Sequence, residues 1–324
     1  DSEDVRAEIV NIMKFWLEKG VDGFRMDATT SYYTGNTSAC TAFLSWLHDE
    51  AVKLNPDVYI VGECWESDSV IRTYYSSSDI DSFFHFSLAQ SDGDIAKSLT
   101  VSAPAKKLKS VMNRALELAQ GHIPAIFLDN HDVNRITSGI GRSNLNRLKF
   151  TYGIASVFNG CLYTYYGTEI GMIGSGSDEN KRIAMLWDSK NTKNLCENPP
   201  NTSKDEYAFE GVKQQQKDKE SILNYHKQAN YLRNLHPAIA RGAMTFYDKL
   251  GDDYVLVLEK TWNDSTICIV INTHDDQSVT VDLSSLANTY TKVDTLSVSN
   301  SEVKLKDISS VEIPAYTIAV FSGE

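Results

Sequence analysis

Three carboxylates, Asp27, Glu63 and Asp132, stand at the ends of apolar segments of this sequence. The segments read GVDGFRMDA, YIVGECW and IFLDNHDVNR, and each begins like a buried strand and closes on its acid. The spacing of the three acids is close to multiples of one strand-plus-helix unit, which takes roughly 30 or more residues in an α/β barrel. Such barrels carry their chemistry at strand ends on one rim. Two or three carboxylates around one pocket could cleave glycosidic bonds.

Arg25 stands two residues before Asp27 on the first of these strands, so both side chains should point the same way. A cation beside a carboxylate favours its ionised form, which attack on a sugar carbon requires. Taken alone, the pair would more simply be a structural ion pair between the strand and the barrel. Together with the other two acids, the catalytic interpretation is favoured, with Asp27 as the attacking group.

Glu63 ends its strand beside Cys64 and Trp65. An apolar neighbourhood favours the protonated form of a carboxyl group, and a proton donor to the glycosidic oxygen needs that form. Trp65 fits a sugar-stacking platform and plain packing at the rim equally well. Tyr32, just after the first strand, is a candidate for an acceptor subsite, although packing is the more common role of such a tyrosine.

Asn130, His131 and Asp132 follow the third apolar segment directly. Asp132 could stabilise an oxocarbenium-like charge or bind sugar hydroxyls, and Asn130 and His131 could bind hydroxyls beside it. The same tripeptide could instead supply metal ligands or a helix N-cap. Because no further His or Cys stands at ligand spacing, sugar contact is favoured and no metal ligand is assigned.

The elements that would carry these residues alternate between strand and helix up to residue 240. Apolar runs predict strands at 21–27, 58–63, 80–86, 125–129 and 160–166, and helical periodicity predicts helices around 5–16, 42–54, 106–119, 145–157 and 222–235. This alternation is typical of a parallel α/β sheet. A polar stretch from about 189 to 216 has no clean period and predicts a long irregular excursion.

The pattern changes after Gly242, where VLVLEKTW, TICIVINT, VTVDLSS and TIAVF read as short alternating strands. We therefore predict an α/β fold, a partial TIM (β/α)8 barrel with about five C-terminal strands over 1–240, followed by an antiparallel β-sandwich domain over 241–324. Five strands do not close a barrel of eight, so the missing N-terminal part of the barrel is expected to precede residue 1.

Bulk properties exclude several classes of partner. The net charge of −12 argues against nucleic acid and against an anionic membrane surface. No apolar run approaches the length of a membrane span, and no leader with a cleavage site opens the chain. The five scattered cysteines match neither a zinc site nor a disulfide framework.

The three segments together resemble the conserved regions of the α-amylase family, glycoside hydrolase family 13. The pattern GFRxDA is matched from Gly23 to Ala28, the GE pair by Gly62 and Glu63, and FLxNHDxxR from Phe127 to Arg135. YGTEIGM, from Tyr166, and KRIAMLW, from Lys181, resemble the family's last barrel strand and the loop after it. Similarity covers residues 4 to about 240, with the family's domain C following.

This resemblance implies a retaining hydrolysis of α-glucosidic bonds through a covalent glucosyl intermediate. Asp27 would be the nucleophile, Glu63 the general acid/base and Asp132 the transition-state carboxylate. Arg25 would orient Asp27, and His131 would contact the sugar in the bond-cleaving subsite. The α-glucan substrate that the resemblance implies would be starch or a maltooligosaccharide, and Trp65 after Glu63 favours the α-amylase type acting on α-1,4 bonds.

The resemblance also places the family's region one, its first three strands, its domain B and most of its usual calcium ligands before residue 1. Calcium is thus a candidate cofactor without assigned ligands here. Many α-amylases carry a Lys-His pair three residues beyond the nucleophile, where this chain has Thr30 and Ser31. An extracellular location is expected because polymeric starch is met outside the cell, although a cytoplasmic one stays open.

Three alternatives remain at this point. One is an α-glucosidase or transglycosylase acting on short oligosaccharides. Another is a non-catalytic glucan-binding relative, although such relatives tend to lose the three acids that this chain retains. The last is a chain that is inert because its barrel is incomplete. Chain-length preference, α-1,4 against α-1,6 selectivity and oligomeric state do not follow from the sequence.

Overall fold

The computed structural model describes residues 2–203 and 207–323. These residues form two compact units, each of which is described separately. The first unit comprises the chain up to residue 87 together with 114–125, and the second comprises 88–113 and the chain from 126 onward. Neither boundary falls at residue 240, so the division of the chain into domains 1–240 and 241–324 stays a prediction.

Five short strands form the barrel-type sheet. They are β1 (Gly23–Met26), β2 (Tyr59–Gly62), β3 (Ser82–Phe84), β4 (Ile123–Phe127) and β5 (Cys161–Tyr163), and they follow one another in that order in the sheet. The pairing is parallel from β1 to β4. β1, β2, β3 and β5 are shorter than their apolar runs, and β4 ends two residues before its run does, because the residues that follow each strand already turn away. Asp27 and Glu63 therefore lie just beyond the carboxyl ends of β1 and β2, on one edge of the sheet.

The helices of the first unit pack on one another as a layer. They are α1 (Glu3–Leu17), α2 (Thr37–Leu54) and α3 (Asp68–Ser77), and the 3₁₀ turns η1 (Thr29–Ser31) and η2 (Phe86–Leu88) follow β1 and β3. The core of this unit contains Leu44 and Leu47 of α2, Ile71 of α3, and Ile60 and Phe83 of the strands. Met13 of α1 is buried in this core, and Ile9, Val10 and Leu17 of the same helix pack against it while partly exposed.

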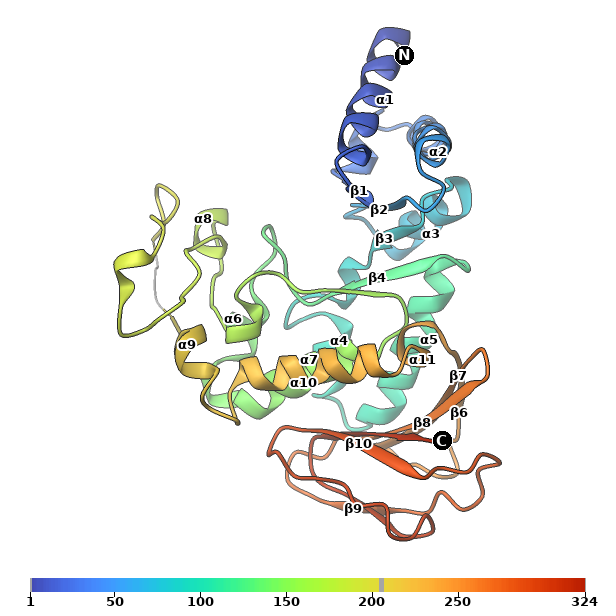
Figure 1. The fold of residues 1–324 in the computed structure, drawn as a ribbon, viewed down its shortest axis with the longest axis vertical. Helices are drawn as coiled ribbons and strands as arrows, with labels where there is room; N and C mark the ends of the chain where they lie inside the picture. The colour runs from blue at the N-terminus through green and yellow to red at the C-terminus, as the bar shows by residue number, and fades with distance from the viewer. Residues whose placement is uncertain (1, 204–206, 324) are drawn as a thin grey trace. The chain divides into compact units, whose positions relative to one another are not determined.

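The helices of the second unit are α4 (Asp94–Ser98), most of α5 (Pro104–Ala119), α6 (Ile136–Ile140), α7 (Leu145–Ser156), α8 (Asp178–Lys181), α9 (Val212–Gln215), α10 (Ile222–Leu235) and α11 (Ala238–Arg241). Figure 1 shows α10 running beside α7. The predicted helix 222–235 is confirmed as α10, which Ser221 caps at its start and Pro237 follows at its end. The predicted irregular stretch contains the 3₁₀ turn η5 (Thr192–Asn194) and α9, and residues 204–206 lie outside the described part. The remaining 3₁₀ turns are η3 (Arg142–Asn144) and η4 (Thr168–Ile170).

The C-terminal residues of the second unit form two antiparallel sheets. The larger sheet has the order β10 (Lys292–Ser297), β12 (Thr317–Ser322), β8 (Ser265–Asn272), β7 (Val255–Trp262) and β6 (Ala243–Phe246), and the smaller pairs β11 (Val311–Ile313) with β9 (Val279–Val281). Val257, Val270 and Phe321 of the larger sheet share a core with Val311 and Ile313 of the smaller one. The predicted parallel strands followed by an antiparallel β domain are therefore confirmed.

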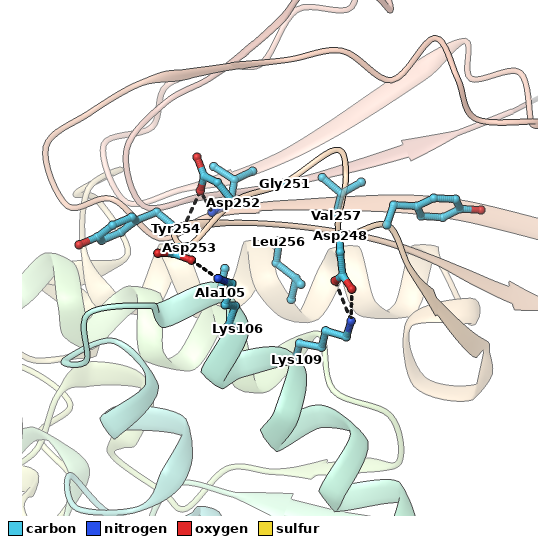
Figure 2. A pocket seen from close by; sticks show the side chains of 12 residues that line it. Ala105, Lys106, Lys109, Asp248, Gly251, Asp252, Asp253, Tyr254, Leu256 and Val257 are labelled. Carbon is cyan, nitrogen blue, oxygen red and sulfur yellow. Dashed lines mark hydrogen bonds and ion pairs between the residues drawn. The ribbon is translucent and has the colours of Figure 1, made fainter.

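The start of α5 contacts the connection between β6 and β7. A groove of about 770 Å³ lies there. Figure 2 shows Leu256 between two ion pairs, Lys109–Asp248 and Lys106–Asp253. On one side Lys109 Nζ binds the Asp248 carboxylate at 2.6 and 2.7 Å, and on the other Ala105 N–H donates to the Asp253 carbonyl at 2.9 Å. These contacts fasten the first turns of α5 to the β domain.

Among residues 2–203 and 207–323, we find no helix with the length and apolar character of a membrane span.

Candidate functional site

Arg25 joins the two acids of the first unit. Its Nη1 pairs with Asp27 Oδ1, and its Nη2 lies 2.9 Å from Glu63 Oε1. The parallel register places Arg25 opposite Val61, so the ends of β1 and β2 lie side by side. One guanidinium therefore binds both carboxylates, and the predicted pairing of Arg25 with Asp27 is present although Arg25 is exposed rather than buried.

Glu63 is fixed by the chain that follows β1. Its Oε2 accepts a hydrogen bond from Ala28 N–H at 2.9 Å, and its carbonyl accepts one from Thr29 N–H at 2.9 Å and one from Thr29 Oγ1 at 2.7 Å. Its own N–H donates to Met26 O at 2.9 Å. These bonds hold the carboxyl group of Glu63 in a single orientation.

Gly62 makes the close approach of these segments sterically feasible. A Cβ at this position would lie 2.4 Å from Phe83 Cε1 and 3.2 Å from Thr29 Cγ2. Real Cβ atoms do not approach so closely, so a glycine before Glu63 is required by packing.

The two carboxylates differ in their access to solvent. The Asp27 side chain is 78% exposed, and that of Glu63 is 10% exposed. An open carboxylate can reach a substrate carbon, while an enclosed one has few water contacts and can exchange a proton with a bound group. This asymmetry suits one nucleophile and one acid/base held by a shared arginine.

Two aromatic residues flank these acids. Trp65 is exposed and stacks on Phe86, with ring centroids 4.9 Å apart and 9° between the planes. Tyr32 packs edge-on against Phe43. Burial, and secondly the negative charge of Asp27, raises the pKa of the Tyr32 phenol to about 12, so this tyrosine stays a neutral neighbour of Asp27. Trp65 suits a sugar-stacking platform, because Phe86 supports one face of its ring while the side chain stays exposed.

The third acid belongs to the second unit. Asp132 binds His131 Nε2 through Oδ2 at 3.0 Å and Arg182 Nη2 through Oδ1 at 2.8 Å. Asn130 forms the turn itself, because its Oδ1 accepts from the N–H groups of Asp132 and Val133 at 2.8 Å each. Asn130 thus has a structural role that the sequence interpretation as a substrate contact did not include, and no helix begins at Asp132.

Two buried residues close to Asp132 in the sequence, Asp129 and Arg135, received no role in the sequence analysis. Asp129 is buried and accepts hydrogen bonds from Ile136 N–H at 2.9 Å and Thr168 Oγ1 at 2.6 Å, and its burial raises the pKa of its carboxyl group. Arg135 is also buried and donates to the carbonyls of Lys181 and Tyr166. The predicted motif already contained Asp129 and Arg135, but nothing in their types shows that they connect the turn to residues 166–181.

The structure thus brings Arg25, Asp27 and Glu63 together in the first unit, with Tyr32 near them. Trp65 follows Glu63 by two residues and stacks on Phe86. Asn130, His131 and Asp132 lie together in the second unit. Within the described part of the chain, no group of three or more His, Cys, Asp or Glu side chains could hold a metal ion. Calcium therefore stays a prediction without assigned ligands among these residues.

Comparisons with known proteins agree on one family. The family model described as the α-amylase catalytic domain matches residues 1–242. "Alpha-amylase 3" of Dictyoglomus thermophilum is 32% identical over 287 residues, covering 84% of this chain and 54% of that protein. "Oligo-1,6-glucosidase" of Heyndrickxia coagulans is 29% identical over 207 residues, covering 54% of this chain and 37% of that protein.

The solved structure "Eubacterium rectale Amy13B" is similar over 100% of this chain and 64% of its own, with a TM-score of 0.89 and 33% identity. This chain spans about half the length of the D. thermophilum relative and a smaller share of the H. coagulans one.

Proposed function

This chain belongs to the α-amylase family, glycoside hydrolase family 13, and from that membership we propose that it carries the catalytic acids of a hydrolase of α-1,4-glucosidic bonds in starch and maltooligosaccharides. The observation that carries the proposal is the Arg25 bridge between an exposed Asp27 and an enclosed Glu63. Retaining glycosidases need two such carboxyl groups about 5–5.5 Å apart.

In the first step Asp27 attacks the anomeric carbon of the bound glucosyl unit. The bond between that carbon and the glycosidic oxygen breaks, and Glu63 gives its proton to this oxygen, so that the leaving sugar departs neutral. Arg25 keeps Asp27 directed at the carbon. The product of this step is a glucosyl ester on Asp27.

In the second step Glu63, now ionised, takes a proton from a water molecule. The water oxygen bonds to the anomeric carbon, and the ester bond to Asp27 breaks. Two displacements on one carbon retain the α-configuration. Asp132 would stabilise the positive charge that develops on the sugar in both steps, and His131 would donate to a hydroxyl of the same sugar.

Trp65 and Tyr32 would bind sugars on the leaving side of the bond. A tryptophan whose rear face is covered by Phe86 offers one free face, on which a pyranose ring can stack. Asn130 would act on this site through the turn that it forms rather than through the sugar.

The test compares wild type, Glu63→Gln and Glu66→Gln for release of reducing sugar from soluble starch and maltoheptaose. Glu66 is an exposed glutamate three residues further on and serves as the matched control. We expect Glu63→Gln to lose about 10²-fold or more in rate and Glu66→Gln to equal wild type. Equal rates in all three would contradict the proposal.

A second candidate, cleavage of α-1,6 bonds in short oligosaccharides, has support from the relative named oligo-1,6-glucosidase. Isomaltose and isomaltotriose in the same assay separate the two, because an α-1,6 enzyme would prefer them to maltoheptaose. If no variant acts on any substrate while starch still retards the chain in an affinity gel, a glucan-binding role replaces both.

We further propose that the protein acts outside the cell, since polymeric starch is met there. Activity in the culture medium of the source organism, rather than in its washed cells, is the expected outcome of fractionation.

A further inference from the structure

We propose that Lys181 and Arg182 are positioning residues that hold Asp132 and its backbone in place, a role that rests on the proposed function of Asp132. Arg182 makes the first contact: its Nη2 binds Asp132 Oδ1 at 2.8 Å while its Nε donates to the His131 carbonyl at 3.0 Å. One planar guanidinium therefore fixes a carboxylate oxygen and the preceding peptide at once.

Lys181 makes the second contact, with the backbone of Asp132. Its side chain is only 5% exposed, and its Nζ donates to the Asp132 carbonyl at 2.6 Å and pairs with Asp178 Oδ1 at 2.8 Å. A buried ammonium group is costly unless its hydrogens are satisfied. A carbonyl and a carboxylate satisfy two of them, and the carbonyl belongs to the residue whose placement matters.

The segment that carries both cations is itself anchored. Buried Arg135 donates to the Lys181 carbonyl at 3.0 Å, and its own N–H donates to Gly174 O at 2.9 Å. Asp178 also receives Arg182 Nη2 at 3.3 Å, so one carboxylate is shared by both cations. The turn 130–135 and the segment 174–182 therefore hold one another through contacts made far apart in sequence.

Asp132 has both carboxylate oxygens engaged, one by Arg182 and the other by His131 Nε2 at 3.0 Å. Such an arrangement leaves the carboxylate little freedom to rotate. A group that acts on developing charge must be aligned before the reaction, and displacements of about 1 Å can cost about 10²-fold in rate. Loss of either cation should thus lower kcat more than it raises KM.

The test uses the longest natural form of the protein that contains these residues. Lys181→Met and Arg182→Gln are each expected to lower kcat by about tenfold or more on maltoheptaose while KM changes less than about threefold. Arg182→Lys should recover part of the kcat, because it retains the charge but not both donors. Arg142→Gln is the matched control: Arg142 also donates to a carbonyl, that of Tyr207 at 2.9 Å, but does not contact the Asp132 turn.

A double-mutant cycle separates positioning from a merely structural role. In an Asp132→Asn background, adding Arg182→Gln should lower kcat by less than about a further twofold, because Arg182 acts through the Asp132 carboxylate, which that background already lacks. Full additivity of the losses in kcat from Asp132→Asn and Arg182→Gln would overturn the proposal. A kcat for Lys181→Met and Arg182→Gln equal to that of Arg142→Gln would also overturn it.

Failure of the proposed function is recognised separately, by equal inactivity of wild type and Glu63→Gln. In that case hydrogen exchange of the peptide 130–136 decides. Faster exchange there in Lys181→Met, with the exchange of the β domain unchanged, supports the positioning role of Lys181. Exchange equal to that of wild type refutes it.

Discussion

Ala28, directly after the proposed nucleophile, holds a left-handed backbone conformation at φ 40° and ψ 53°. Its N–H is thereby available to Glu63 Oε2. Residues with a Cβ occupy this region at a cost, and β-branched residues are outliers there. The strain at Ala28 is thus part of what joins Asp27 to Glu63.

We expect Ala28→Val to lower the free energy of unfolding by about 1–3 kcal/mol and Ala28→Gly to leave it within about 1 kcal/mol of wild type. Urea unfolding of the three proteins measures both values. Equal destabilisation by valine and glycine would show that the backbone conformation at this position is not the controlling feature.

Two buried histidines make stability depend on pH. Burial, followed by the charge of Arg114, lowers the pKa of His85 to about 4, and burial lowers that of His226 to about 3. An unfolded histidine titrates near 6.5, so below that pH the unfolded chain binds protons that the folded chain does not. Their contribution to stability is complete above about pH 6.5 and is lost as the pH falls toward the folded values.

His226→Phe should keep the stacking on Tyr152 and remove one of these protons. Between pH 7 and pH 5 its free energy of unfolding should therefore fall by about 2 kcal/mol less than that of wild type. Urea titrations at pH 7, 6 and 5 measure the difference, and parallel curves for the two proteins would rule out His226 as a contributor.

At the scale of single residues, the sequence predicts the features that depend only on neighbouring positions in the chain. Asp27 and Glu63 stand at strand ends, and the two-residue period of a strand places Arg25 with Asp27. The Glu63–Ala28 hydrogen bond and the contacts of Lys181 and Arg182 with Asp132 could not be predicted, because they join segments that only the fold brings together. The family resemblance found in the motifs is confirmed by the match over residues 1–242.

Lys260 connects elements of the second unit from the middle of β7. It is fully buried, and its Nζ donates to Val157 O, Asn159 Oδ1 and Ile239 O at 2.7 Å each. Burial, and secondly the charge of Arg233, holds its pKa well below the usual lysine value. One ammonium group thus attaches the β domain to the residues after α7 and to α11.

Lys260→Met should fit the same volume but leave these three acceptors without a donor. We expect a loss of about 2–4 kcal/mol in the free energy of unfolding, because unsatisfied buried acceptors are costly. Exposed Lys249→Met is the control and should change little. Thermal and urea unfolding that shows the same stability for both variants would mean that water or neighbouring groups replace the lysine.

Capping of α2 gives a smaller effect. Asn36 Oδ1 accepts from Ala39 N–H at 3.0 Å. Asn36→Ala should destabilise the chain by about 1 kcal/mol and Asn36→Ser by less, since serine can also cap. Urea midpoints of the two variants check the order, and a reversed order would contradict the capping role.

Elements were predictable where one signal was long and uninterrupted. β7 and α10 have the expected bounds, since eight apolar-rich residues or four helical turns outweigh their surroundings. β6, β10 and β11 were missed: β10 reads KVDTLS, with a charge in its middle, and β11 has only three residues. Pairing with neighbours, rather than local pattern, makes these segments strands.

At the scale of the whole molecule, α1 of the first unit and the β7–β8 pair of the second bury their apolar residues to different degrees. In α1 of the first unit, Val5, Ile12, Phe15 and Trp16 are 47–57% exposed. In the second unit, β7 and β8 pair over eight residues, and six of the eight are buried in each strand. Regions with few buried apolar contacts open at lower free energy than the global transition.

We therefore expect native-state hydrogen exchange of this chain, measured in rising urea, to release the amides of α1 at lower urea than those of β7 and β8. The amides of α10, in the second unit, serve as the internal reference and should follow β7. Simultaneous exchange of α1, α10 and β7 at every urea concentration would show a single cooperative transition, and the exposed face of α1 would then have no energetic consequence. Exchange of the α1 amides alone at low urea would instead assign the low stability to that helix. The variant Ile12→Lys removes an exposed apolar side chain and should leave the exchange of the β7 and β8 amides unchanged.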